Sequence, residues 1–234
     1  MFKGKVVAFA LMLVFATSVY AGDVDDCYSD VGISCSLMKV NICPFGDFEY
    51  LRDACTPTGS QYIWIEAKDS GNLPIPGIPW TDYWLGSCTA GKVLFLCASP
   101  IGADSLTGAN GRTTFSGRIA GGGCNIPAGA LTGSGIYMAI QGKIIKTKPY
   151  PCTSNPKCVA VDVKSPDLTG TGGAPDGIVN LSDLVPFGSS YNTAWGVTPP
   201  PGKAFNACCD YNDDNSCNLS DFAFFGTHYQ HKCQ

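Results

Sequence analysis

The sequence predicts a mainly β protein, a two-layer sandwich, followed by a small helical module. Apolar residues alternate with polar ones from Ser36 to about Val163, and clusters of glycine, proline and asparagine separate the alternating stretches. This pattern is typical of short antiparallel strands. The 234 residues include 28 Gly, 16 Pro and only 15% charged residues, which argues against a helical bundle and against a disordered chain. A twelve-residue segment near the C-terminus occurs twice, and it predicts the helices.

The first 21 residues predict a cleaved signal peptide. Lys3 and Lys5 give a basic start, an uncharged apolar run covers Val6 to Val14, and Ala21 closes a small-residue cleavage site. The apolar run is shorter than the roughly 20 residues that a membrane-spanning helix needs. We therefore expect a secreted protein, extracellular or at the cell surface, with no membrane span. Its two domains are expected at residues 22–164 and 165–234.

Thirteen cysteines follow the predicted leader. Export makes disulfide bonds their expected state. No two of them have Cys-x-x-Cys spacing, which argues against zinc knuckles. The odd number leaves at least one thiol without a partner in the same chain, and the pairing cannot be read from the sequence.

Four apolar stretches predict strands of the sandwich. Three alternate, so that their apolar side chains share one face: Ile63 to Ala67, Ile136 to Ile140 before a turn at Gln141–Gly142, and Val159 to Val163. Val93 to Cys97 is continuously apolar, as expected for a strand that is buried on both faces. Six or seven such strands are enough for a sandwich.

Two turn-rich segments carry a family resemblance. Asp-Ser-Gly-Asn-Leu-Pro-Ile-Pro-Gly (69–77) follows one strand, and Asn-Gly-Arg-Thr-Thr-Phe (110–115) comes about forty residues later. In this respect residues 35–150 resemble bacterial immunoglobulin-like domains of the invasin and intimin type. The resemblance implies an immunoglobulin-like β-sandwich. The high cysteine content is a departure from that family, and it suggests that disulfides supplement a small core.

The repeat is the clearest signal in the chain. Asn-Leu-Ser-Asp-Leu-Val-Pro-Phe-Gly-Ser-Ser-Tyr (180–191) recurs as Asn-Leu-Ser-Asp-Phe-Ala-Phe-Phe-Gly-Thr-His-Tyr (218–229), with seven of twelve positions identical. This level of identity indicates a duplicated unit. In each copy apolar residues follow the aspartate, which predicts a short helix that is entered from an acidic loop.

The loop before the second copy has the spacing of a calcium site. Oxygen-bearing side chains fall at positions 1, 3, 5, 9 and 12, and position 7 offers a main-chain carbonyl. One turning loop can then surround a hard cation, and flexible carboxylates and amides suit Ca²⁺ better than the rigid octahedron of Mg²⁺. The candidate ligands are Asp210, Asn212, Asp214, Ser216, Asn218 and Asp221.

The loop before the first copy predicts a second, less regular calcium site. Residues 176–183 match positions 5 to 12, including the glycine of position 6. Asp167, the acidic candidate for position 1, lies 16 residues before Asp183 instead of 11, so five residues within Gly170–Pro175 must bulge out. A flexible insertion of this kind has a small entropic cost. The candidate ligands are Asp167, Thr169, Asp176, Ile178, Asn180 and Asp183.

Two such loops, each followed by a short helix, resemble a dockerin, the calcium-folded module of cellulosomal enzymes, over residues 165–231. The resemblance implies a compact pair of loop–helix units that fold on binding Ca²⁺ and dock onto a cohesin-type β-sandwich. The sequence departs from the family in several places. The first loop carries the insertion, Asn215 replaces the usual glycine of position 6, Cys217 replaces an aliphatic residue, and Thr198–Gly202 separates the copies with a stiff linker.

The sequence predicts a protein without catalytic activity. Glu49 and Glu66 are its only glutamates, so a glycosidase pair would have to come from aspartates that are assigned to calcium or to turns. The net charge of −4 argues against a nucleic-acid partner. We expect an extracellular structural or adhesive protein whose tail docks onto a β-sandwich, either of a separate protein or of another copy, which would give a homo-oligomer or filament. One alternative is a cellulosome-like accessory protein, with a sandwich that binds polysaccharide and a dockerin-like tail that binds a cohesin. Another is a purely structural role for calcium.

His228, His231 and Cys233 have the residue types of a transition-metal site. We favour another interpretation, in which the histidines lie on the exposed face of the last helix and Cys233 forms a disulfide.

Overall fold

The computed structural model describes residues 22–34, 38–45, 51–53, 62–89, 93–94, 102–115, 120–126, 135–148, 151–170 and 174–233. Within these ranges the protein is mainly β, with several small sheets and two α-helices. The predicted signal peptide lies outside the described residues, as do Cys35, Cys55 and Cys97. No helix in the described part is both long and apolar enough to cross a bilayer.

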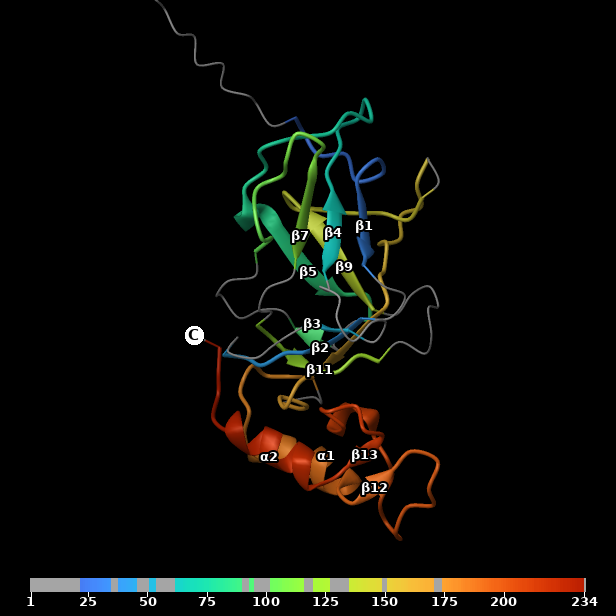
Figure 1. Ribbon diagram of the computed structural model, residues 1–234, viewed down its shortest axis with the longest axis vertical. Coiled ribbons are helices and arrows are strands. Elements are labelled where there is room, and N and C mark those ends of the chain that lie inside the picture. The colour runs from blue at the N-terminus through green and yellow to red at the C-terminus, as the bar shows by residue number, and fades with distance from the viewer. Residues whose placement is uncertain are drawn as a thin grey trace, which may run out of the picture.

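Two three-stranded antiparallel sheets form the upper part of the molecule in Figure 1. One contains β1 (Asp30–Ile33), β4 (Ile63–Glu66) and β7 (Arg112–Phe115), and the other contains β5 (Tyr83–Ser87), β9 (Ile136–Ile140) and β10 (Lys143–Ile144). The alternating residues predicted to face the core are buried between them, including Ile63, Ile65, Ile136, Met138 and Ile140. This arrangement is consistent with the predicted β-sandwich.

The predicted turns occupy the expected places. Asp69 Oδ1 accepts hydrogen bonds from the main-chain N–H groups of Gly71 and Leu73, both at 2.9 Å, and so closes the first turn-rich segment. Gln141 and Gly142 connect β9 to β10 with φ angles of 50° and 79°. Two successive left-handed residues are what a tight two-residue hairpin requires.

A third sheet lies between the sandwich and the helices (Figure 1). It contains β11 (Val161–Lys164), β2 (Met38–Asn41) and β3 (Leu51–Asp53), and β11 runs parallel to β2. We expected antiparallel strands throughout, and this expectation is wrong here. The two strands are far apart in the sequence, so no hairpin fixes their direction.

The remaining strands form short pairs. β6 (Val93–Leu94) pairs with β8 (Gly122–Gly123), and β12 (Thr193–Ala194) pairs with β13 (Ser216–Cys217). The rest of the apolar run to Cys97, predicted to be a buried strand, lies outside the described residues. Single 3-10 turns occur at Trp80–Asp82 (η1) and Ala207–Cys209 (η2).

Each copy of the repeat forms one helix, α1 (Leu181–Ser190) or α2 (Leu219–Thr227). Asn180 and Asn218 cap the two helices, and the aspartate of the third helical position accepts a bond from the main chain of the cap residue in both. The repeated phenylalanines, Phe187 and Phe225, are buried in a second core, which also includes Tyr211, Cys43 and Cys217. We call residues 165–233 the loop–helix segment.

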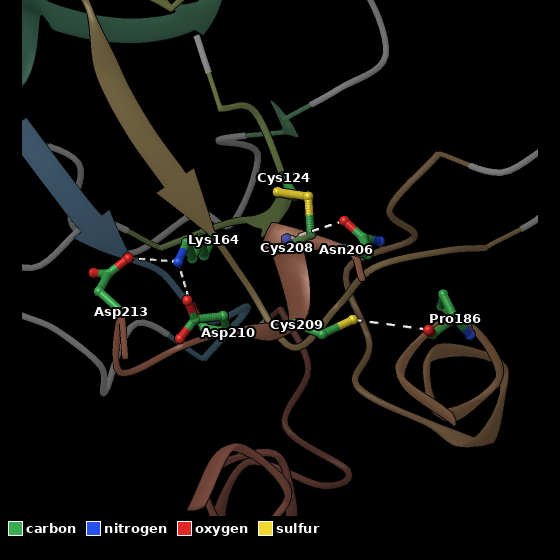
Figure 2. The surroundings of a disulfide bond; sticks show 8 residues. All are labelled: Cys124, Lys164, Pro186, Asn206, Cys208, Cys209, Asp210 and Asp213. Carbon is green, nitrogen blue, oxygen red and sulfur yellow. Dashed lines mark hydrogen bonds and ion pairs between the residues drawn. A yellow bond between two sulfur atoms is a disulfide. The ribbon is translucent and has the colours of Figure 1, made fainter. Parts of the chain in front are cut away.

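Disulfide bonds connect distant parts of the chain. Cys27–Cys152 and Cys88–Cys158 lie within the first 164 residues, whereas Cys124–Cys208 joins the end of β8 to η2 of the loop–helix segment. Figure 2 shows this last bond beside the end of β11. The loop–helix segment is therefore attached covalently to the rest of the protein through Cys208, which is far from residue 165 in the sequence but near it in space. The predicted domain boundary at residues 164 and 165 stays a prediction.

Candidate metal centre

The second loop brings three of its predicted ligands together. Asp210, which follows η2, Asp214, in the loop, and Asp221, in the first turn of α2, each offer a carboxylate oxygen, and these oxygens lie within 4.8 Å of one another. Asp210 and Asp221 are buried, whereas Asp214 is exposed. Carboxylate oxygens are the ligands that Ca²⁺ prefers.

Main-chain hydrogen bonds hold the two buried carboxylates in place. Asp221 Oδ1 accepts from the N–H of Tyr211 at 2.7 Å, and its Oδ2 accepts from the N–H of Asn218 at 2.9 Å. The Asp210 carboxylate accepts from the N–H groups of Asp214 and Asn215, both at 3.1 Å. The loop is thereby folded around its first and last ligands.

The predicted ligands between these ends are engaged with one another. Asp214 Oδ2 accepts hydrogen bonds from the side-chain amides of Asn212 at 3.0 Å and Asn218 at 3.1 Å. Asn218 Oδ1 accepts from the N–H of Ser220 and caps α2. Ser216 lies in β13 and donates its N–H to Asp214 Oδ1. All six predicted residues of the second loop thus lie in one hydrogen-bonded unit.

The first loop repeats this arrangement despite its insertion. Asp183 Oδ1 accepts from the N–H groups of Leu168 and Thr169 at 2.7 and 2.8 Å, and its Oδ2 accepts from Asn180 N–H at 2.8 Å. The Asp167 carboxylate accepts from Asp176 N–H at 3.2 Å and from Gly177 N–H at 2.9 Å. Asp167 and Asp183 therefore stand where Asp210 and Asp221 stand in the second loop, and the extra residues lie between Thr169 and Asp176.

The two loops also differ. Among the residues that the structure describes, the carboxylates of Asp167, Asp176 and Asp183 do not form a cluster within 4.8 Å, as those of the second loop do. Asp176 Oδ1 accepts from the N–H of Ile178 at 3.1 Å, as Asp214 Oδ1 does from Ser216, but Ile178 forms an isolated β-bridge with Lys232. The second loop is thus the better formed of the two candidate sites.

The unusual Asn215 adopts the backbone conformation of the glycine that it replaces. Its φ angle is 66°, and that of Gly177 at the matching position of the first loop is 82°. Both angles are left-handed, and asparagine tolerates this region better than most residues with a side chain. The departure from the dockerin pattern at this position therefore leaves the turn intact.

Burial makes the negative charge of these loops unfavourable. Burial, followed by the neighbouring Asp183 charge, raises the pKa of Asp167 to about 7. Burial also raises the pKa values of Asp183 and Asp210, although Lys164 opposes the shift at Asp210. The pKa of the exposed Asp214 is lowered, first by the hydrogen bond from the Asn212 amide. A bound cation would favour the charged form of every one of these carboxylates.

This charge predicts a pH dependence that calcium reverses. Between pH values of about 4 and 7, the folded calcium-free protein holds a proton on Asp167 that the unfolded chain has already lost. Its free energy of unfolding should therefore rise as the pH falls, by at most about 1.4 kcal/mol per pH unit for each such proton. With saturating calcium the free energy should fall over the same range, because the ion binds the deprotonated loops. The protein is first stripped of calcium, and urea unfolding at several pH values then gives the free energy of unfolding with and without added calcium. The same dependence on pH under both conditions would contradict the prediction.

Two lysines near the second loop were not foreseen from the sequence. Lys164, at the end of β11, is buried, and its Nζ donates to the main-chain oxygen of Asp210 and, at 2.6 Å, to Asp213 Oδ1 (Figure 2). Lys39 Nζ, from β2, lies 3.2 Å from the same Asp213 oxygen. In the sequence, the feature that could have pointed to these contacts is Asp213, an acidic residue at a loop position that supplies no ligand. Both lysines anchor the loop to the third sheet.

Replacing Lys164 by methionine should destabilise the protein by roughly 3 kcal/mol, because it leaves the Asp210 carbonyl and the Asp213 carboxylate without their buried donor. Lys39→Met is the matched control. Its cation is more exposed, and an exposed ion pair contributes less than about 1 kcal/mol. Urea unfolding in saturating calcium compares the two variants, and equal effects would contradict the assigned role of Lys164.

Comparison with known proteins does not establish a family. No protein-family model matches the sequence, and no curated protein matches it. Two solved structures align over most of the chain, both interface mutants of a type II cohesin–X-dockerin complex from Acetivibrio cellulolyticus. One is 14% identical and covers 84% of this chain and 96% of that chain, with a TM-score of 0.27. The other is 12% identical and covers 87% and 97%, with a TM-score of 0.28. Similarity at this level does not establish a common fold.

Proposed function

We propose that the protein is a secreted, non-enzymatic, calcium-binding structural or adhesive protein whose loop–helix segment docks onto a β-sandwich of a partner protein. The observation that carries the proposal is a repeated, exposed apolar residue. Leu181 and Leu219 are identical in the two copies, and their side chains are 65% and 68% exposed. The repeated phenylalanine, Phe187 or Phe225, is buried. A leucine that is present in both copies and contributes to neither core is suited to bind another molecule.

The surroundings of these leucines support a docking surface. Val185 is 73% exposed, one turn along α1 from Leu181. A groove of about 370 Å³ between the helices has a mostly apolar lining, made by Leu184, Phe187, Gly188, Tyr191, Leu219 and Phe222. Exposed apolar side chains and an apolar groove on the same pair of helices are features of interaction sites on soluble proteins. Calcium in the two loops would fix the starts of both helices and thereby the shape of this surface.

The partner that we favour is the sandwich of a second copy. The buried side of the loop–helix segment is already occupied within the chain, where Asn41 Nδ2 donates to the main-chain oxygen of Tyr211 at 2.9 Å and Cys43 joins the second core. The exposed helix face is therefore left for contact between molecules. A contact between two different surfaces of identical subunits produces chains or filaments unless the geometry closes a ring.

Light scattering after size exclusion tests the proposal on residues 22–234, in millimolar calcium and in chelator. We expect large species in calcium only, and we expect the double variant Leu181→Asp/Leu219→Asp to remain a monomer. Val197→Asp is the matched control, because Val197 is 63% exposed and lies in the loop–helix segment outside both helices. A wild-type monomer at high concentration in calcium would exclude self-docking. Retention of the large species by the double variant would exclude the helix face.

A second candidate function is polysaccharide binding by the sandwich. A groove on the β4–β7 surface is lined by Tyr62 and Trp64 together with polar side chains, among them Asn110 and Arg112. An aromatic surface beside hydrogen-bonding groups suits a sugar ring. Affinity electrophoresis in soluble glucans tests this function, and we expect the glucans to retard the wild-type protein. Trp64→Ala should lose this retardation. Trp195→Ala is the control and should keep it, because the exposed ring of Trp195 belongs to the loop–helix segment. Unretarded wild-type protein would exclude binding to the glucans tested.

A further inference from the structure

A cysteine and two histidines from opposite ends of the chain meet beside the second core. Cys43, just after β2, places its Sγ 3.5 Å from His231 Nδ1, although the two residues are 188 positions apart. His228 Nδ1 lies 3.3 Å from the same His231 nitrogen. The three residues offer ligand atoms that all lie within 4.8 Å of one another.

This arrangement differs from both interpretations made from the sequence. Cys233 is disulfide-bonded, as expected. The expected exposure of the histidines is wrong for His228, which is only 7% exposed because the end of α2 packs against the rest of the protein. Cys43, and not Cys233, is the cysteine beside the two rings.

The backbone and neighbouring rings hold the cluster in position. The main-chain oxygen of His231 accepts from Val179 N–H at 2.8 Å, and its N–H donates to the main-chain oxygen of His228 at 3.0 Å. Phe45 contacts the His231 ring with the centroids 5.3 Å apart, and Phe224 contacts the His228 ring at 4.9 Å. The donor atoms therefore converge without a large rearrangement.

Hydrogen bonding alone accounts poorly for this convergence. An imidazole nitrogen carries either one hydrogen or one lone pair, so His231 Nδ1 cannot make a good hydrogen bond to the Cys43 sulfur and to His228 Nδ1 at the same time. A metal ion at the centre would use one lone pair from each donor. With Zn–N of about 2.0–2.1 Å, Zn–S of about 2.3 Å and tetrahedral angles, the donors should be about 3.4 Å apart for N···N and about 3.5 Å apart for N···S. His231 Nδ1 lies 3.3 Å from His228 Nδ1 and 3.5 Å from Cys43 Sγ, which agrees with two of these three separations, and the ligand atoms of Cys43 and His228 lie within 4.8 Å of each other.

We propose that Cys43, His228 and His231 bind a divalent transition-metal ion of the zinc type. The sulfur would bind as a thiolate, so that the thiol proton passes to solvent when the ion enters. Sulfur and imidazole donors select such an ion over calcium, whereas the all-oxygen loops select calcium. The described residues supply three donors of such a site. The ion would connect the segment after β2 to the end of α2.

Cobalt(II), a coloured substitute for zinc, tests the site in residues 22–234 saturated with calcium. We expect one equivalent of cobalt to produce the thiolate-to-metal charge-transfer band and the strong ligand-field bands of a tetrahedral ion, and one equivalent of zinc to abolish both. Calcium occupancy of the loops keeps cobalt out of them, and cobalt bound to oxygen alone would show no thiolate band. Absence of that band in the wild-type protein would overturn the proposal without any variant.

Variants identify the ligands. Cys43→Ala should abolish the thiolate band, and His231→Gln should weaken cobalt binding at least tenfold, on the order expected for loss of one ligand. Cys217→Ala is the matched control, because Cys217 is also buried in the second core but lies outside the cluster. Near-ultraviolet circular dichroism in calcium checks that each variant is folded. A thiolate band that persists in folded Cys43→Ala, or disappears in folded Cys217→Ala, would overturn the assignment.

Discussion

Replacement of Asp221 by asparagine is expected to weaken calcium binding at the second loop by on the order of 100-fold. The side chain has two roles that both need its negative charge. It is the candidate ligand at position 12, and it accepts main-chain hydrogen bonds from Tyr211 at 2.7 Å and from Asn218 at 2.9 Å. An amide in its place lacks the charge and puts an N–H group where one of these acceptors was. Loss of this capping interaction should also destabilise α2 by about 1 kcal/mol.

Calorimetric titration with calcium measures the effect on each loop separately. Wild-type protein should show two binding events, Asp221→Asn should lose or weaken one, and Asp183→Asn should do the same to the other. Asp23→Asn is the control, because Asp23 is an exposed aspartate that pairs with Lys143 far from the loops. Wild-type affinity in Asp221→Asn would mean that the second loop is not a calcium site.

The parts of this protein that were predictable are those in which a local pattern determines the structure. The apolar residues after each repeated aspartate predicted a short helix, and the structure has one in each copy, with Asn-Leu-Ser-Asp supplying the cap and its reciprocal partner. Loop spacing likewise predicted which residues would lie together, because positions 1 and 12 of such a loop are brought together by its own turn. Alternation identified β4 and β9 for the same reason, since a one-residue shift would expose every apolar side chain in them.

The rest depends on contacts between residues that are distant in the sequence. Nothing local to Lys164 shows that it ends beside Asp213, because that contact depends on how the loop–helix segment packs onto β11. The parallel pairing of β11 with β2 and the meeting of Cys43 with His231 have the same origin. The spacing of the cysteines also gave no information about which of them pair, since the bridge between Cys124 and Cys208 spans 84 residues.

Removal of that bridge is the second large effect that we expect. In the chain-entropy treatment a closed loop of 84 residues stabilises the folded state by at most about 4.5 kcal/mol, and the other disulfides reduce this value by shortening the effective loop. The double variant Cys124→Ser/Cys208→Ser should therefore lose a few kcal/mol in free energy of unfolding. Replacing both cysteines avoids a new free thiol beside Cys209, which is adjacent in sequence.

The matched control removes Cys88–Cys158, which closes a loop of similar length, 70 residues, but lies outside the loop–helix segment. Both double variants should be destabilised to a similar extent, yet they should differ in how they unfold. Loss of Cys124–Cys208 removes the covalent link between η2 and the end of β8, where Lys164 and Asn41 then provide much of the remaining polar contact, whereas Cys233 at the end of the segment stays disulfide-bonded. Urea unfolding of that variant in chelator should therefore show the loop–helix segment unfolding first, as a separate transition that calcium merges with the main one. A single transition under both conditions would show that the two parts remain one cooperative unit without the Cys124–Cys208 bridge.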